Sequence, residues 1–171
     1  MNIVKIFTII FFLYYAPYGC ADNFYKIPFN FLDEKNQPLN LSTFSGQISV
    51  ITFAFANCRK VCVESLHVME RLQKEATVAN KTVNFIVISY DPLNDTPGDW
   101  AEYRLHHNIG YSNWFFLTGT IENTHALAHT LGFDYWLYDE HIMHDFKITL
   151  LNEQGEVSKT MDWNNRNDHW F

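Results

Sequence analysis

Two cysteines, Cys58 and Cys62, lie four residues apart where an apolar run gives way to a helical pattern. Side chains at positions i and i+4 of a helix share a face, so both sulfur atoms can point at one atom. The helix N-terminus and the neighbouring Arg59 and Lys60 should lower the pKa of both thiols. Thiolates are nucleophiles and also soft ligands that select Cu(I). The pair therefore indicates a redox site or a copper site, and a purely structural pair of small buried side chains is the alternative.

A metal site needs a ligand beyond two thiolates, and the chain has eight histidines that could supply an imidazole. His144 is the best candidate because it lies just before a predicted strand, 146–151, whose start should lie near the end of the strand that precedes the cysteines. His141, three residues earlier, is the second candidate. His125 and His129 have the i, i+4 spacing of helical metal ligands, but the sequence offers no acidic partner nearby. That pair is interpreted as solvent-exposed, as are the remaining histidines: His67, His106, His107 and His169.

The pattern of apolar residues predicts the elements that must hold these side chains. The run ISVITFAFA at 48–56 is typical of a central strand that is covered on both faces. An amphipathic helix over 60–78 follows, then a second buried strand over 83–90 and a helix over 97–107 with Asp95 or Thr96 as its N-cap. The other expected elements are a hairpin or loop over 28–44, a strand or turn over 114–117, a helix over 122–131, and strands over 133–138, 146–151 and 156–160, the last two joined by a turn at 152–155. The tail from 162 to 171 has no assignment.

The order of these elements predicts the fold. A strand, helix and strand in succession imply a parallel pair with a right-handed crossover, and an antiparallel hairpin follows later in the chain. With the cysteines at the end of the first strand of that unit, this layout is typical of an α/β, thioredoxin-like fold, in which a central mixed sheet is flanked by helices. The segment 28–44 is then an extra N-terminal hairpin. A chain of 171 residues is about the size of one domain.

Composition and the first residues bound the location and the partners. The formal charge of -7 comes without a basic cluster, so nucleic acid is not expected as a partner. Residues 1–21 have the positive start and the apolar run of a signal peptide, or of a lipoprotein signal in which Cys20 is the lipidated residue. We therefore expect an exported domain over 22–171. It would be periplasmic, or anchored to the membrane through its N-terminus and facing the periplasm.

Three motifs in the expected order resemble those of the Sco (SenC) proteins, a family of copper-delivery and redox factors for assembly of the Cu-A centre of cytochrome c oxidase. The first is the strand ISVITFAFANC that leads into C-x-x-x-C at 58–62. The others are ISYDPLNDTP at 88–97 and His144 placed eleven residues before Gly155. Together the motifs span most of the chain.

The resemblance implies that Cys58, Cys62 and His144 bind one copper ion, as Cu(I) or Cu(II), within a thioredoxin-like Sco domain. It also implies a partner, either cytochrome c oxidase subunit II or another exported copper or thiol protein. The distance to Gly155 selects His144 over His141. Asp91 corresponds to a loop aspartate of the family and is interpreted as structural.

The chain departs from the family pattern at three positions. Arg59 and Val63 stand where the family commonly has proline after each cysteine, and Met143 replaces the usual aspartate before the histidine. The loss of that aspartate removes an acceptor that would orient the imidazole. Met143 could instead offer a soft axial contact to the metal.

A thiol-disulfide oxidoreductase is the competing function, since one thiolate could attack a partner disulfide and the other could resolve the mixed disulfide. Two observations count against the common thiol enzymes. No proline follows Pro97, so the cis-proline that faces the cysteines of an ordinary thioredoxin has no counterpart. A peroxiredoxin has threonine three residues before its cysteine, where this chain has Phe55.

Overall fold

The computed structural model describes residues 23–58, 61–139 and 141–171. The predicted leader at 1–21, with Cys20, and the charged pair Arg59 and Lys60 lie outside the described residues. The strands are β1 (Asn30–Asp33), β2 (Pro38–Asn40), β3 (Ile48–Ala54), β4 (Val83–Ser89), β5 (Trp114–Thr118), β6 (Tyr135–Tyr138), β7 (His141–His144), β8 (Ile148–Leu151) and β9 (Val157–Met161). The helices are α1 (Val61–Val78), α2 (Pro97–His106) and α3 (Ile121–Thr130), with two short 3-10 helices, η1 (Phe24–Lys26) and η2 (Leu41–Phe44).

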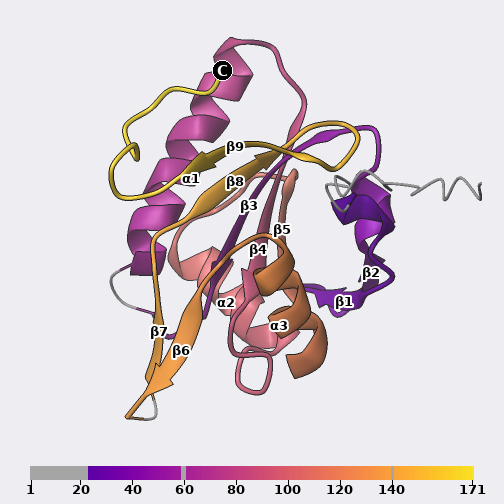
Figure 1. Ribbon diagram of the computed structural model, residues 1–171, viewed down its shortest axis with the longest axis vertical. Coiled ribbons are helices and arrows are strands. Elements are labelled where there is room, and N and C mark those ends of the chain that lie inside the picture. Colours follow the sequence, from indigo (N-terminus) through magenta and orange to yellow (C-terminus); the bar gives the residue numbers. More distant parts are fainter. Residues whose placement is uncertain (1–22, 59–60, 140) are drawn as a thin grey trace, which may run out of the picture.

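A seven-stranded mixed sheet forms the centre of the molecule, in the order β2-β1-β5-β4-β3-β8-β9 (Figure 1). The strands β3, β4 and β5 run parallel, and β1 and β8 join them as antiparallel neighbours. Every residue of β4 is buried, as expected for a parallel strand with both faces covered. The mixed α/β sheet and the extra N-terminal hairpin, β1–β2, are therefore confirmed.

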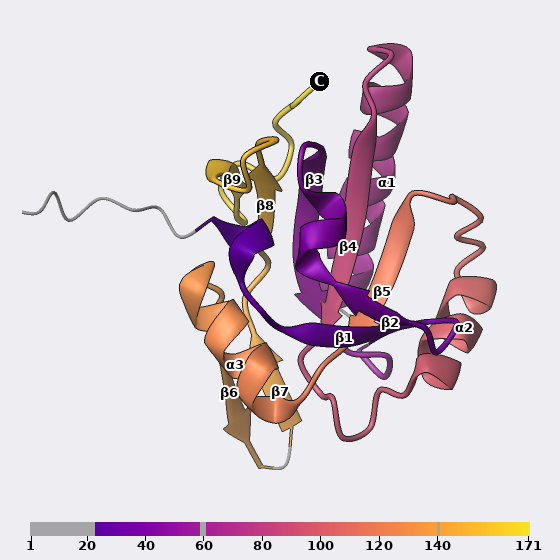
Figure 2. The ribbon, with the colours of Figure 1, turned by 90° about the vertical axis from the view of Figure 1, so that its right-hand side faces the viewer.

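Helices cover both faces of this sheet, which gives the molecule three layers. In Figure 2, α1 and α2 lie on one side of the sheet and α3 lies on the other. Met69 and Leu72 of α1 and Trp100 of α2 are fully buried in the first layer. On the other face, Leu127 of α3 packs in one cluster with the N-terminal segment that contains η1 and η2. In the described part of the chain, no helix is long and apolar enough to span a membrane.

The segment that carries His144 differs from the sequence prediction. We expected one strand over 133–138 and a loop before the strand at 146–151. Instead β6 pairs with β7, an additional strand, to form a separate two-stranded sheet in which Tyr135 faces His144 across the ladder. The later hairpin, β8–β9, is confirmed, and Gly155 in its turn has a φ of 78°, which glycine adopts without strain.

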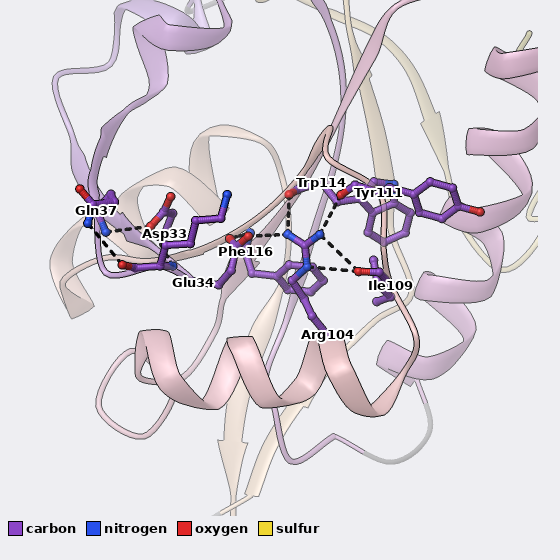
Figure 3. A network of polar contacts seen from close by, with 9 residues as sticks. Asp33, Glu34, Gln37, Arg104, Ile109, Tyr111, Trp114 and Phe116 are labelled. Carbon is purple, nitrogen blue, oxygen red and sulfur yellow. Dashed lines mark hydrogen bonds and ion pairs between the residues drawn. The ribbon is translucent and has the colours of Figure 1, made fainter.

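The half-buried Arg104 of α2 ties the N-terminal hairpin to the sheet (Figure 3). The Arg104 guanidinium forms an ion pair with Glu34 and donates hydrogen bonds to the carbonyl oxygens of Trp114 at 3.0 Å and Tyr111 at 2.7 Å. The second carboxylate oxygen of Glu34 accepts from the backbone N–H of Phe116 in β5. The network thus fixes the β1–β2 turn against the sheet.

The C-terminal tail, 162–171, forms no helix or strand and packs along α1. The Glu75 carboxylate of α1 accepts hydrogen bonds from the backbone N–H of Trp170 at 3.0 Å, from His169 at 2.7 Å and from Arg71 at 2.8 Å. Burial opposes ionisation of this carboxyl, but the three hydrogen bonds hold the pKa of Glu75 below its ordinary value. The tail is therefore part of the folded domain.

Candidate metal centre

The loop after β3 brings both cysteines to the start of α1. The backbone N–H of Cys58 donates to the carbonyl oxygen of Phe55 at 3.0 Å, which closes a turn directly after the strand. The Cys58 Sγ then accepts from the backbone N–H of Cys62 at 3.4 Å, which gives a partner to one N–H group in the first turn of α1. Cys58 is half-buried and Cys62 is fully buried, and no disulfide joins them.

The β6–β7 hairpin places His144 beside the two thiols. The Nε2 atom of His144 lies 3.3 Å from the Sγ of Cys62 and 3.8 Å from the Sγ of Cys58. Its Nδ1 atom lies 3.1 Å from the backbone oxygen of Asp145, a contact that favours a proton on Nδ1 and leaves the Nε2 lone pair directed at the sulfurs. The three ligand atoms all lie within 4.8 Å of one another, so they could hold one metal ion. Among the described residues, this is the one group of three or more histidine, cysteine or acidic side chains with such geometry.

The neighbours of His144 in β7 do not join the group. His141 is exposed at the other end of the strand, opposite Tyr138. Met143 is 42% exposed, and alternation along the strand directs its side chain to the face opposite His144. The axial contact that the sequence suggested for Met143 therefore has no support in this arrangement. Of the six histidines predicted to be exposed, His107 is half-buried. The other five are exposed, as predicted: His67, His106, His125, His129 and His169.

Burial changes the expected protonation of one thiol. The helix N-terminus and the neighbouring basic residues predict a lowered pKa for both cysteines, but burial raises the pKa of Cys62, and the adjacent Cys58 raises it further. In the metal-free protein, Cys62 is therefore a neutral thiol at neutral pH. A cation that binds here must displace its proton, and the charge of the cation then offsets the desolvation of the thiolate.

Aromatic side chains surround the imidazole. The ring of Tyr90 lies 4.9 Å from the His144 ring, and the ring of Phe55 meets it edge-on at 5.8 Å. The Tyr90 side chain is 3% exposed, and its hydroxyl group has no hydrogen-bond partner among the described residues. These contacts restrict rotation of His144 and exclude water from that side of the site.

Asp95 holds the cysteine loop in place, a role that sequence reasoning missed. One carboxylate oxygen accepts from the backbone N–H of Ala56 at 3.0 Å, and the other accepts from the hydroxyl of Ser89 at 2.6 Å. The predicted N-cap role belongs to Thr96, which forms a capping box with Asp99. Burial raises the pKa of Asp95 to about 6, although both hydrogen bonds favour the ionised carboxylate. The carboxyl therefore joins the end of β4 to the loop that leads into Cys58.

Comparison with known proteins gives consistent matches in sequence and in structure. A curated relative, the SCO1 protein homolog of Bacillus subtilis, is 31% identical over 97 residues, which cover 57% of this chain and 50% of the relative. The chain thus spans about half the length of that relative. A SCO1/SenC family lipoprotein of Bacillus anthracis has a TM-score of 0.72 at 26% identity, covering 78% of this chain and 82% of that one.

Two further solved structures of Sco proteins are similar to this chain. BsSco, described as a member of the Sco family of cytochrome c oxidase assembly proteins with a disulfide switch, has a TM-score of 0.71 at 25% identity over 82% of this chain and 84% of its own. ScoI of Arabidopsis thaliana, solved with copper bound, has a TM-score of 0.71 at 20% identity over 80% of this chain and 87% of its own, a likeness that shows the fold. The SCO1/SenC family model matches residues 20–170, so the chain belongs to the SCO1/SenC family.

Proposed function

We propose that this protein binds one copper ion through Cys58, Cys62 and His144 and delivers it to the Cu-A centre of cytochrome c oxidase. The observation that carries the proposal is the convergence of two thiol sulfurs and one imidazole nitrogen within 4.8 Å. Soft thiolates with one imidazole suit copper in preference to the hard cations Mg²⁺ and Ca²⁺. Membership of the family and the copper-bound structure of a relative support copper over other soft metals.

The geometry also suggests how such a site could release its metal. One thiol is fully buried and the other is half-buried, so an incoming ligand from a partner meets Cys58 first. Because ligand exchange conserves the total number of donors around the metal, copper can pass to a partner without becoming a hydrated ion. Oxidase subunit II is the partner that we propose.

Copper binding by single-site variants tests the site. We expect one copper per chain for the wild type and for His141→Ala, and strongly weakened binding for His144→Ala, because only His144 directs a nitrogen at both sulfurs. His141 is the matched control, since it is the same residue type in the same strand. Unchanged copper affinity in His144→Ala would show that His144 is not a copper ligand.

A thiol-disulfide exchange function remains the second candidate, and the disulfide switch described for BsSco supports it. In that reaction the Cys58 thiolate attacks a partner disulfide and forms a mixed disulfide, releasing one partner thiolate. The Cys62 sulfur then attacks Cys58 and releases the second partner thiolate, so that the partner gains two electrons and this chain gains a disulfide. The raised pKa of Cys62 slows this second step, which favours the copper function. Rapid reduction of a partner disulfide by the copper-free protein, independent of His144, would favour exchange instead.

We further propose that the protein is exported and acts in the periplasm, free or anchored at the membrane through its N-terminus. The apolar leader at 1–21 supports export, and a lipoprotein among the similar proteins supports lipidation at Cys20. Mass spectrometry of the mature protein tests this: an N-terminus at residue 22 indicates simple cleavage, and a diacylated Cys20 indicates a lipid anchor. An intact Met1 would contradict export by a cleaved signal.

A further inference from the structure

The β6–β7 hairpin has one face that packs on the domain and one that does not. Directly opposed residues of an antiparallel pair share a face, and successive residues alternate between faces. Tyr135 and His144 are opposed and lie on the inner face, at the metal site. The opposed pairs that alternate with them form what we call the outer face: Trp136, Tyr138, His141 and Met143. Figure 1 shows the hairpin extending past the end of the main sheet, where a partner can approach it.

The outer face is apolar and exposed to a degree that folding does not explain. Trp136 is 50% exposed, Tyr138 is 70% exposed and Met143 is 42% exposed. Tryptophan and tyrosine dominate the energetics of protein interfaces, and methionine adapts its shape to a partner. A contiguous apolar patch of this kind marks an interaction site more often than a neutral surface.

The charges around the outer face limit the kind of partner. Among the described residues, Asp134, Asp139 and Asp145 lie in or directly beside the hairpin, and the basic side chain at its base, Lys147, donates to the carbonyl oxygen of Gly132 and lies over the Phe133 ring. An acidic border favours a partner surface whose own border is basic, and opposes approach to an anionic lipid surface. The pattern therefore fits a protein with an apolar patch rimmed by Lys and Arg.

We propose that the outer face of the β6–β7 hairpin docks a partner protein with an apolar patch bordered by basic residues, and that it holds this partner beside the metal site. The inference rests on the proposed function, with the Cu-A domain of oxidase subunit II as the partner. Because Met143 and His144 are successive residues of β7, a partner on the outer face contacts the same strand that carries a metal ligand on its other face. Docking and ligand exchange then use the two faces of one hairpin.

The test measures binding of the copper-free protein to the copper-free Cu-A domain by titration calorimetry. We expect Trp136→Ala and Tyr138→Ala each to raise the Kd at least about tenfold, as truncation of central interface residues does. Two matched controls lie elsewhere on the surface: Trp163→Ala, at 43% exposure, and Leu105→Ala, at 79% exposure. These should change the Kd less than about twofold, and wild-type binding should weaken as salt is raised. All four variants should keep wild-type copper stoichiometry and circular dichroism spectra.

The outcomes separate docking from delivery because binding is measured without copper. If hairpin variants bind as tightly as the wild type, docking on this face is overturned, even where copper transfer proceeds. If hairpin variants lose binding and the wild type transfers no copper, docking stands and delivery fails. Absence of wild-type binding overturns the docking proposal. Two other results would also overturn the proposal: binding of phosphatidylcholine vesicles, or self-association, that depends on Trp136 and Tyr138 and that the Cu-A domain does not compete with. The first would assign the outer face to a membrane, and the second to another copy of the chain.

Discussion

Replacing Asp95 with asparagine should stabilise the copper-free protein at neutral pH, although it removes a buried side chain with two hydrogen bonds. Burial raises the pKa of Asp95 from 3.8 to about 6. Each pKa unit corresponds to about 1.4 kcal/mol, so ionised Asp95 costs the folded state about 3 kcal/mol at neutral pH relative to the unfolded chain. Asparagine keeps the shape and the acceptor for the Ala56 N–H without the charge, so up to about 3 kcal/mol should be recovered.

The predicted effect has a defined pH window. Below pH 3.8 the carboxyl of Asp95 is protonated in both states, and its contribution to stability is fully present. Between 3.8 and about 6 only the unfolded state ionises, so the wild type loses stability as the pH rises through the folded-state pKa. Asparagine does not titrate. The advantage of Asp95→Asn should therefore grow across this window and become constant above it.

Urea unfolding followed by circular dichroism at a series of pH values, with reductant and a copper chelator present, measures this difference. Asp99→Asn is a control of opposite sign, because hydrogen bonds from Thr96 lower the pKa of Asp99. That variant should lose stability relative to the wild type as the pH rises. A difference between Asp95→Asn and the wild type that stays constant across the series, or a variant that is less stable at pH 7, would refute the assignment of a desolvated carboxylate.

Three further substitutions test the contacts that hold the domain together, all by urea unfolding. Arg104→Met should destabilise the protein by about 3–5 kcal/mol because it leaves the Glu34 carboxylate buried and unpaired, and adding Glu34→Gln should restore part of the loss. Glu75→Gln should destabilise it at neutral pH, and this difference should vanish as the pH falls through the lowered folded-state pKa, because the wild-type contribution is lost there. Tyr90→Phe should change stability by less than about 1 kcal/mol, since the hydroxyl has no partner in the part of the chain that the structure describes, and a larger loss would contradict this.

The elements that sequence reasoning predicted well are those with a strong local pattern. The runs that became β3 and β4 are predominantly apolar, as is typical of strands covered on both faces, and α1 has a clear amphipathic repeat. Cys58 and Cys62 could be singled out because their spacing and their place at a strand-to-helix junction are both local. Residue types and spacing alone were enough to predict that these two thiols could share a ligand.

The hairpin β6–β7 was predicted only in part because β7 has no such pattern. Its sequence, HIMH, has polar residues at both ends, and its outer face is apolar where a solvent-facing strand would ordinarily be polar. His144 was placed by resemblance to a family and by proximity to a predicted strand. The structure adds the physical reason for choosing it over His141, since the pairing of β7 with β6 turns His144 toward the cysteines and leaves His141 at the exposed end.

The raised pKa of Cys62 and the role of the Asp95 carboxyl could not be predicted, because both depend on contacts between segments that are distant in the sequence. A helix N-terminus acts on a thiol within one turn and can be read from the sequence, whereas burial of Cys62 depends on segments that meet only in the folded chain. Asp95 is a second case: it lies two residues before Pro97, the first residue of α2, yet its carboxylate accepts hydrogen bonds from Ala56 and Ser89 at the ends of two neighbouring strands. Local pattern therefore identifies which side chains can carry the chemistry. The ionisation state in which they carry it is decided by tertiary burial, and a cation that replaces the proton of Cys62 is the simplest way for this buried site to hold two thiolates.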